Sequence, residues 1–243
     1  MLIDKIEILI LDSDSISRQI LETRLLINGY NVLSAIDGEQ AIRLCKIHQP
    51  DIILLDILLP KMDGYEVCYN IRRKYNIPII IVTALDDISD RIMGLNFGAD
   101  DYITKPFCPK ELNARIRSVL RKNTKFFTTN PNKKKYLFTI GNLSIDTFNR
   151  KVLIEGEKIH LTGLEFVLLE VLTKRAGQVL SRTYILNNVW GYVPERYVDT
   201  RIVDVHISRL RCKIEKDARN PNLILTIRGV GYMFQNYGDC SKT

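Results

Sequence analysis

Side chains that could carry out phosphoryl transfer follow short apolar runs in the first 105 residues of the chain. They are an acidic pair, an isolated aspartate, a threonine and a lysine: Asp12 and Asp14, Asp56, Thr83, and Lys105. Continuous runs of β-branched and other apolar residues, separated by helical stretches, are typical of buried parallel strands. The ligand site of an open α/β sheet lies outside the carboxyl ends of its strands. We therefore predict that these side chains meet at one site.

The residue types fit a carboxylate that accepts a phosphoryl group. Such a nucleophile, here Asp56, needs a divalent cation to offset negative charge, and the carboxylates of Asp12 and Asp14 are suitable hard ligands. Lys105 can contact the incoming phosphoryl group as a point charge. Thr83 offers a hydroxyl that can move toward the added phosphate. No other polar set at these strand ends competes with this interpretation.

Strand and helix patterns alternate five times over the first 122 residues, and these elements must position the site. The strand patterns lie at 6–11, 31–35, 51–55, 78–82 and 101–104. The helical patterns lie at 15–27, 38–47, 64–74, 88–97 and 109–122. This alternation implies right-handed βαβ crossovers and an α/β fold with a doubly wound, five-stranded parallel sheet.

The pattern changes after residue 122, which predicts a second domain. Residues 123–136 lose all periodicity and are interpreted as a linker. Beyond the linker, a capping box from Thr162 to Glu165 opens the first of three predicted helices. Short strands precede these helices and a glycine-containing hairpin follows them, which is the element order of a winged helix. The predicted domains are 1–122 and 137–236, with a tail at 237–243.

The charge of the chain is divided unevenly between the two domains. Residues 1–122 carry 16 Lys and Arg against 17 Asp and Glu, a net charge of −1, whereas residues 123–243 carry 19 against 11, a net charge of +8. A cationic half joined to a nearly neutral half indicates that the cationic half binds a polyanion. No apolar run approaches the ~20 residues of a membrane helix, so no membrane partner is expected. Five scattered cysteines without metal-finger spacing favour a reducing compartment.

The third predicted helix of the second domain, at about 199–216, has an apolar and a polar face. A helix of this size fits the DNA major groove, and a glycine-pinched hairpin carrying a cation fits the minor groove. His206 lies between the two faces, so packing and phosphate contact are both open for it. We expect residues 137–236 to bind duplex DNA whose site is a direct repeat, with each subunit reading one half-site. The predicted DNA-binding residues are Arg201, His206, Ser208, Arg209, Arg211, Lys213 and Arg228.

Sequence motifs in both halves resemble one protein family. The first half contains DILLPKMDG (56–64), GADDYITKPF (98–107) and PKEL (109–112), and it resembles the receiver domain of two-component response regulators. The second half contains VDVHISRLR (203–211) and TIRGVGY (226–232), and it is similar to the winged helix of the OmpR/PhoB class. Other segments look like the subgroup found in cyanobacteria and algal plastids: LETRL (21–25), GYVPERYVDTR (191–201) and NPNLILTIRG (220–229).

The resemblance implies a function and a set of site residues. The protein would be a transcriptional regulator, not an enzyme, with Asp56 as phosphoacceptor, Thr83 and Tyr102 as the switch pair and Lys105 bound to the phosphoryl group. The cofactor would be Mg²⁺, held by Asp12, Asp56 and the backbone carbonyl of Leu58. The Lys105–Pro106 peptide would be cis. The implied partners are a sensor histidine kinase, RNA polymerase and promoter DNA. The compartment would be the chloroplast stroma, or alternatively a bacterial cytoplasm.

One departure from the family pattern affects the metal site. The family usually has two adjacent acidic residues after the first strand, whereas this chain has Asp12-Ser13-Asp14, so Ser13 occupies the place of a direct ligand. A neutral hydroxyl should lower the affinity for Mg²⁺ unless Asp14 reaches in. This leaves open a regulator that binds DNA without phosphorylation. A remote alternative is a phosphatase with Asp12 as nucleophile and Asp14 as acid/base, but it would leave Asp56 unexplained.

A homodimer is expected on activation, through the last helix and strand of the first domain. Charged residues of both signs are predicted to pair across the two-fold axis: Arg91, Asp100, Asp101, Glu111, Arg115 and Lys122. On this hypothesis the substitution Arg115→Asp leaves the monomer folded and prevents dimerisation.

Overall fold

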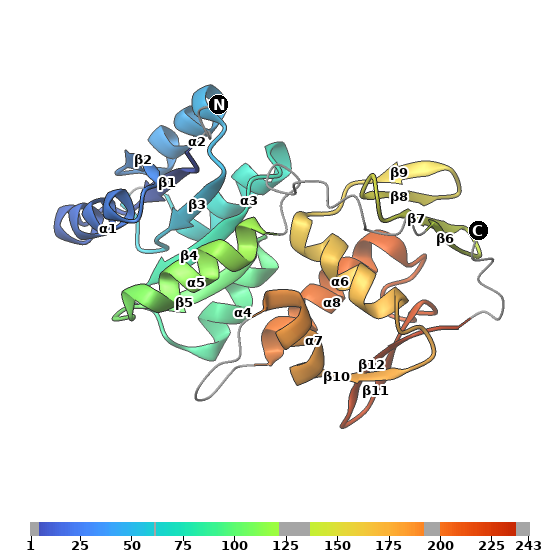
Figure 1. Ribbon diagram of the computed structural model, residues 1–243. Helices are drawn as coiled ribbons and strands as arrows, with labels where there is room; N and C mark the ends of the chain where they lie inside the picture. Colours follow the sequence, from blue (N-terminus) through green and yellow to red (C-terminus); the bar gives the residue numbers. More distant parts are fainter. Residues whose placement is uncertain (1–4, 61, 122–136, 192–199, 237–243) are drawn as a thin grey trace. The chain divides into compact units, whose positions relative to one another are not determined.

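The computed structural model describes residues 5–60, 62–121, 137–191 and 200–236 (Figure 1). The chain divides into two compact units, Met1–Leu120 and Arg121–Thr243, which are taken in turn. Among the described residues, no helix combines the length and the apolar character needed to cross a membrane.

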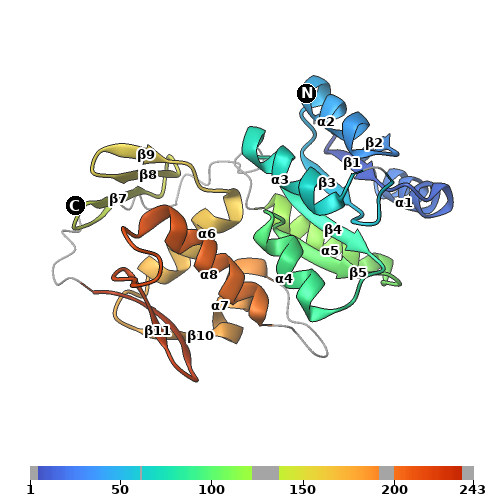
Figure 2. The ribbon, with the colours of Figure 1, turned by 180° about the vertical axis from the view of Figure 1, so that it is seen from behind.

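The first unit is a five-stranded parallel sheet between two layers of helices (Figures 1 and 2). The strands pair in the order β2-β1-β3-β4-β5, so the chain winds outward in both directions from β1 and β3. The strands are β1 (Glu7–Leu11), β2 (Asn31–Ala35), β3 (Ile52–Leu55), β4 (Ile79–Thr83) and β5 (Asp101–Thr104). The helices are α1 (Ser15–Ile27), α2 (Gly38–His48), α3 (Gly64–Lys74), α4 (Ile88–Asn96) and α5 (Pro109–Leu120). The predicted doubly wound α/β fold is confirmed.

The central strands of this sheet are apolar along their whole length because helices cover both of their faces. Every residue of β3 and β4 is buried, and so is β1 after its first residue. The parallel registers Leu11↔Leu55 and Leu55↔Ile81 align the carboxyl ends of β1, β3 and β4. The residue that follows each strand is therefore delivered to the same edge of the sheet.

The second unit has an antiparallel sheet of four strands, three helices and a small three-stranded sheet. The first sheet is β6 (Leu137–Ile140), β7 (Leu143–Asp146), β8 (Lys151–Ile154) and β9 (Glu157–Ile159). There follow α6 (Gly163–Thr173), β10 (Val179–Ser181), α7 (Arg182–Trp190), α8 (Arg201–Ile214), β11 (Ile224–Ile227) and β12 (Gly231–Phe234). The predicted winged-helix order is confirmed, whereas the short strands β9 and β10 were not predicted.

One apolar core joins the elements of the second unit. Trp190 and Phe234 are fully buried in it together with Leu168 of α6 and Ile207 of α8. The predicted capping box is present at the start of α6, since Glu165 N–H donates to Thr162 Oγ1 at 3.2 Å and Thr162 N–H donates to Glu165 Oε2 at 2.8 Å. Two of the four orphan amides at this helix end are thereby satisfied.

Candidate phosphoacceptor site and nucleic-acid interface

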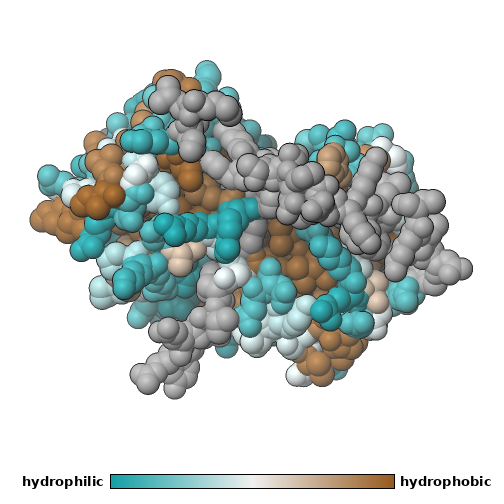
Figure 3. All heavy atoms as spheres, in the orientation of Figure 1, coloured by the Kyte–Doolittle hydropathy of each residue, from teal (hydrophilic) through white to brown (hydrophobic). Residues whose placement is uncertain are grey.

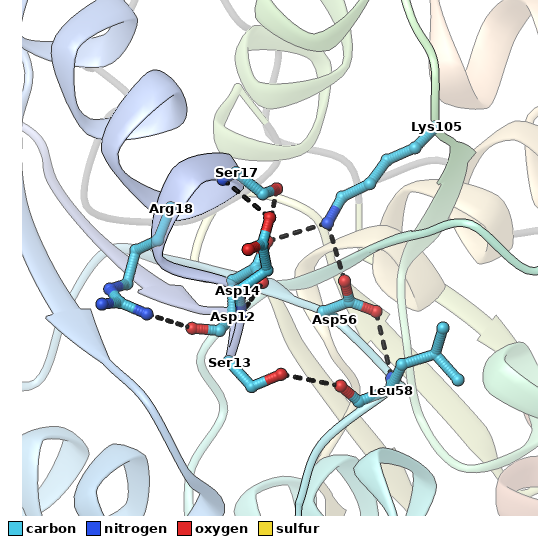
Figure 4. Close-up of polar contacts among 8 residues, drawn as sticks. All are labelled: Asp12, Ser13, Asp14, Ser17, Arg18, Asp56, Leu58 and Lys105. Atoms are coloured by element: carbon cyan, nitrogen blue, oxygen red, sulfur yellow. Dashed lines mark hydrogen bonds and ion pairs between the residues drawn. The ribbon is translucent and has the colours of Figure 1, made fainter.

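Lys105 connects the two carboxylates that end the central strands of the first unit (Figure 4). Its Nζ lies 2.7 Å from Asp56 Oδ2 and 2.8 Å from Asp12 Oδ2. Both aspartates are buried, at 7% and 2% exposed. Burial would lower the pKa of Lys105, but its hydrogen bonds and the charges of Asp12 and Asp56 outweigh burial and raise that pKa above its ordinary value. The ammonium group of Lys105 therefore stays positively charged between the two aspartates.

Asp12 is held in place by several donors besides Lys105. Ser17 Oγ donates to Asp12 Oδ2 at 2.7 Å, and Asp14 N–H donates to Asp12 Oδ1 at 2.9 Å. Arg18 Nη1 donates to the backbone carbonyl of Asp12 at 2.7 Å. The sequence interpretation did not include Ser17 or Arg18. The one sequence feature that could have pointed to Ser17 is its place at a helix start, three residues after Asp14.

Asp14 serves the helix rather than the predicted metal site. It is the N-cap of α1, and its Oδ2 accepts a hydrogen bond from Ser17 N–H at 2.9 Å. Its side chain is exposed, unlike the buried carboxylates of Asp12 and Asp56. The suggestion that Asp14 supplies a metal ligand is corrected, because capping commits its carboxylate to the start of α1.

Ser13 and Leu58 contact each other directly at the edge of the site (Figure 4). Ser13 Oγ donates to the Leu58 carbonyl at 3.0 Å, and Leu58 N–H donates to Asp56 Oδ1 at 3.1 Å. The carboxylates of Asp12 and Asp56 and the carbonyl of Leu58 are hard oxygen ligands of the kind that Mg²⁺ prefers. The donor set thus fits a small divalent cation, with two carboxylates where the family pattern has three.

Thr83 is the last residue of β4, and Tyr102 is the second residue of the neighbouring strand β5. Thr83 is fully buried, and its hydroxyl has no hydrogen-bond partner among the described residues. The Tyr102 hydroxyl donates to the Leu85 carbonyl at 2.6 Å, and Arg91 lies 5.9 Å from the Tyr102 ring centroid. Burial, and then the neighbouring Tyr65 and Asp90, raise the pKa of Tyr102, so its phenol stays protonated. The Lys105–Pro106 peptide is cis, as the resemblance implies.

Only some of the α8 residues that were predicted to contact DNA are exposed on the polar side of this helix. Arg201 and Ser208 are exposed on it, and Arg228 is exposed at the turn of the β11–β12 hairpin. Gly229, with φ +74°, makes that turn, and a Cβ at Gly231 would lie 2.0 Å from the Leu180 carbonyl of β10. The two glycines therefore permit the hairpin that presents Arg228.

His206 is a core residue, so the DNA contact predicted for it is wrong. It is 0% exposed, and its ring packs edge-on against Trp190 with 5.1 Å between centroids. Of the two roles left open for this histidine, the structure supports packing.

Arg209 and Lys213, both predicted to contact DNA, belong to an internal ion-pair cluster. Both approach the carboxylate of Glu165, which is 0% exposed: Lys213 Nζ at 2.7 Å and Arg209 Nη2 at 3.5 Å. Burial would raise the pKa of Glu165, but the charges of Arg209 and Lys213 lower it below its ordinary value. The sequence identified Glu165 as a capping residue and missed this second role.

The predicted dimer face is largely paired within one chain. Arg115 Nη1 contacts both carboxylate oxygens of Asp101 at 2.9 Å, and Arg115 Nη2 contacts Glu111 Oε1 at 2.8 Å. Asp100 and Asp101 are 2% and 1% exposed, and Asp100 pairs with Arg72. Both acids therefore have a cationic partner within one chain, and their pairing across a two-fold axis stays a prediction. Lys122 lies outside the described residues.

Comparisons with known proteins identify the family of both domains. Residues 8–117 match the family described as "Response regulator receiver domain", and residues 156–234 match "Transcriptional regulatory protein, C terminal". A "Probable transcriptional regulator ycf27" of Porphyridium aerugineum is 54% identical over 235 residues, which cover 97% of this chain and 98% of that protein. A "DNA-binding response regulator MtrA" of Mycolicibacterium smegmatis is 43% identical, with 93% and 95% covered. A solved mutant of RitR is 30% identical, with 94% and 98% covered and a TM-score of 0.71.

Proposed function

Because the chain belongs to the OmpR/PhoB class of two-component response regulators, we propose that phosphorylation of Asp56 controls the binding of its winged helix to duplex DNA. The observation that carries this proposal is the position of Lys105, whose ammonium group contacts both Asp56 and Asp12 at the carboxyl end of the sheet. The ammonium group of Lys105 neutralises two carboxylates before phosphorylation. Once one carboxylate carries a phosphoryl group, the same ammonium group can bind the oxygens of that group.

In the proposed reaction, a carboxylate oxygen of Asp56 attacks the phosphorus of a phosphohistidine on a sensor kinase. An O–P bond forms to give an acyl phosphate, while the P–N bond breaks and its electron pair returns to the histidine ring. Mg²⁺, when bound, offsets negative charge at the reacting oxygens, and Asp12, Asp56 and the Leu58 carbonyl would hold it. Lys105 binds the transferred group, and the buried Thr83 hydroxyl gains an acceptor in it.

A second candidate function is a DNA-binding regulator that does not depend on phosphate. The contact between Ser13 Oγ and the Leu58 carbonyl favours it, because it uses a carbonyl that a cation would otherwise bind. In this alternative the first domain acts as a constitutive dimerisation module.

The kinase is proposed to dock on the exposed face of α1. Ile16, Ile20 and Ile27 fall at i, i+4 and i+11 on this helix and are 69%, 52% and 80% exposed. Apolar spheres gather over this helix in the space-filling view (Figure 3). Because α1 begins at Ser15, three residues after Asp12, a partner that covers this face is placed close to the proposed phosphoacceptor site.

The other proposed partners are those that a regulator of transcription needs. The activated protein is proposed to bind promoter direct repeats as a homodimer and to contact RNA polymerase there. The chloroplast stroma is the proposed compartment, supported by the ycf27 relatives and by a richness in Ile, Asn and Lys that is typical of AT-rich genomes.

The phosphoacceptor is tested by mass determination after incubation with acetyl phosphate and Mg²⁺. Wild-type protein should gain one phosphoryl group, and Asp56→Asn should gain none. A phosphoryl group that persists in Asp56→Asn, or that maps to Asp12, would overturn the assignment and support the phosphatase alternative.

A further inference from the structure

A polar cluster connects three elements of the winged-helix unit. Asp204 of α8 accepts two hydrogen bonds at the same oxygen, Oδ1: one from Arg182 Nε of α7 and one from the Tyr232 hydroxyl of β12, both at 2.7 Å. None of these three residues was predicted to act in DNA binding. A single carboxylate on the proposed recognition helix thus joins that helix to α7 and to the wing hairpin.

Arg211 extends the same cluster to the other strand of the hairpin. Its Nη2 donates to the Ile224 carbonyl at 2.6 Å and to Thr226 Oγ1 at 2.8 Å, both on β11. The guanidinium groups of Arg182 and Arg211 lie 5.1 Å and 5.6 Å from the centroid of the Tyr232 ring. Charge-assisted hydrogen bonds and cation–π contacts therefore hold α8 against both strands of the hairpin.

We propose that this cluster, Arg182, Asp204, Arg211 and Tyr232, is a helix–wing brace that fixes the position of the wing hairpin relative to α8 for DNA recognition. The inference rests on the proposed function. Asp204 and Tyr232 are its positioning residues, acting through α8 and the hairpin. Because α8 and Arg228 are proposed to enter neighbouring grooves of one duplex, their spacing must be set before DNA arrives.

The brace explains an acidic side chain on the polar side of α8. A lone carboxylate there would be repelled by DNA phosphates, whereas two arginines and one aspartate give the cluster a net charge of +1. Burial, and then the hydrogen bond and charge of Asp204, raise the pKa of Tyr232 to about 12. The phenol therefore remains a donor to Asp204 at neutral pH.

The test uses the full chain and the variant Tyr232→Phe, which keeps the ring and removes the hydroxyl. Binding is measured on a selected duplex and on a scrambled duplex at two salt concentrations. We expect affinity for the selected duplex to fall on the order of tenfold. Affinity for scrambled DNA should fall less, because no charge is altered and a hairpin released from the brace can still bring Arg228 to a phosphate.

A matched control is Tyr184→Phe. The Tyr184 ring also lies against an arginine, Arg175, at 5.0 Å, but its hydroxyl makes no hydrogen bond among the described residues. This control should bind both duplexes as the wild type does. The loss caused by Arg228→Ala on the selected duplex should be smaller in the Tyr232→Phe background than in the Tyr184→Phe background, because the wing is no longer held in register.

Asp204→Ala, which removes the oxygen that accepts both hydrogen bonds, keeps the proposal testable if Tyr232→Phe does not fold. Removing a negative charge should strengthen binding to scrambled DNA, whereas loss of the brace should weaken binding to the selected duplex. Equal changes on both duplexes, or none, in a folded Tyr232→Phe or Asp204→Ala variant would overturn the brace. A wild-type chain that does not prefer the selected duplex would instead overturn the proposed function.

Discussion

The hydroxyl of Ser13 donates a hydrogen bond of 3.0 Å to the backbone carbonyl of Leu58, across the mouth of the phosphoacceptor site. This contact lowers the expected cation affinity in two ways. The hydroxyl brings no charge where an acidic ligand is usual in the family pattern, and it uses an acceptor that a cation would need. Asp14 does not replace the missing charge because it caps α1.

The substitution Ser13→Asp should raise the affinity for Mg²⁺ on the order of tenfold, equivalent to about 1.4 kcal/mol. The reason is that a third carboxylate then faces the cation. Calorimetric titration measures the affinity, and the rate of mass gain with acetyl phosphate should rise with it. Ser13→Ala is the control, because it removes the contact with Leu58 without adding charge. Identical titrations for Ser13→Asp and wild type would show that the third carboxylate is not needed.

Arg115 should be a stability residue of the receiver. Replacing it with alanine leaves Asp101, which is 1% exposed, without its bidentate partner. Removing one member of a buried pair costs roughly 3 kcal/mol or more. Urea denaturation of residues 1–122 should show this loss. Glu111→Ala, at an exposed partner of the same arginine, should cost less than about 0.5 kcal/mol. Equal stability of Arg115→Ala and Glu111→Ala would show that the buried pair contributes little.

The meeting of the acidic side chains with the lysine was predictable because parallel strands bring their carboxyl ends together, whatever the sequence distance. Asp12, Asp56 and Lys105 were identified by their positions after apolar runs, and they do meet. The roles of Arg115 and Arg209 were not predictable in the same way. A helical pattern places a charge on one face, but the acid that neutralises it comes from another element. Burial of Asp101 and Glu165, which decides the pairing, is a property of the packed fold.

Glu165 should make the stability of the winged-helix domain depend on pH. The charges of Arg209 and Lys213 lower its pKa in the folded state below the ordinary 4.5. Its contribution is therefore complete above pH 4.5 and is lost as the pH falls through the lower folded value. Thermal unfolding of residues 137–236 should show wild type losing more stability than Glu165→Gln over this acidic interval. Parallel pH profiles for the two proteins would contradict the ion-pair role.

Contacts of the winged helix with DNA should divide into sequence-reading and backbone contacts. Arg201→Ala and Ser208→Ala should each weaken a selected site by ~1–3 kcal/mol relative to scrambled DNA. Arg228→Ala should weaken both DNAs alike and reduce the salt slope by about 0.9. Binding isotherms at two salt concentrations separate these effects. Lys213→Ala, at a lysine paired with Glu165, should leave the salt slope unchanged. If Arg201→Ala and Ser208→Ala lower both affinities equally, α8 does not read the sequence.

The central claim is that phosphorylation of Asp56 controls DNA binding. The most direct measurement is the dissociation constant of the full chain for a labelled direct-repeat duplex, before and after treatment with acetyl phosphate and Mg²⁺. Wild type should bind on the order of tenfold more tightly after treatment, and Asp56→Asn should bind equally in both conditions. Equal affinity of the phosphorylated and untreated wild-type protein, or an equal gain in Asp56→Asn, would contradict this account.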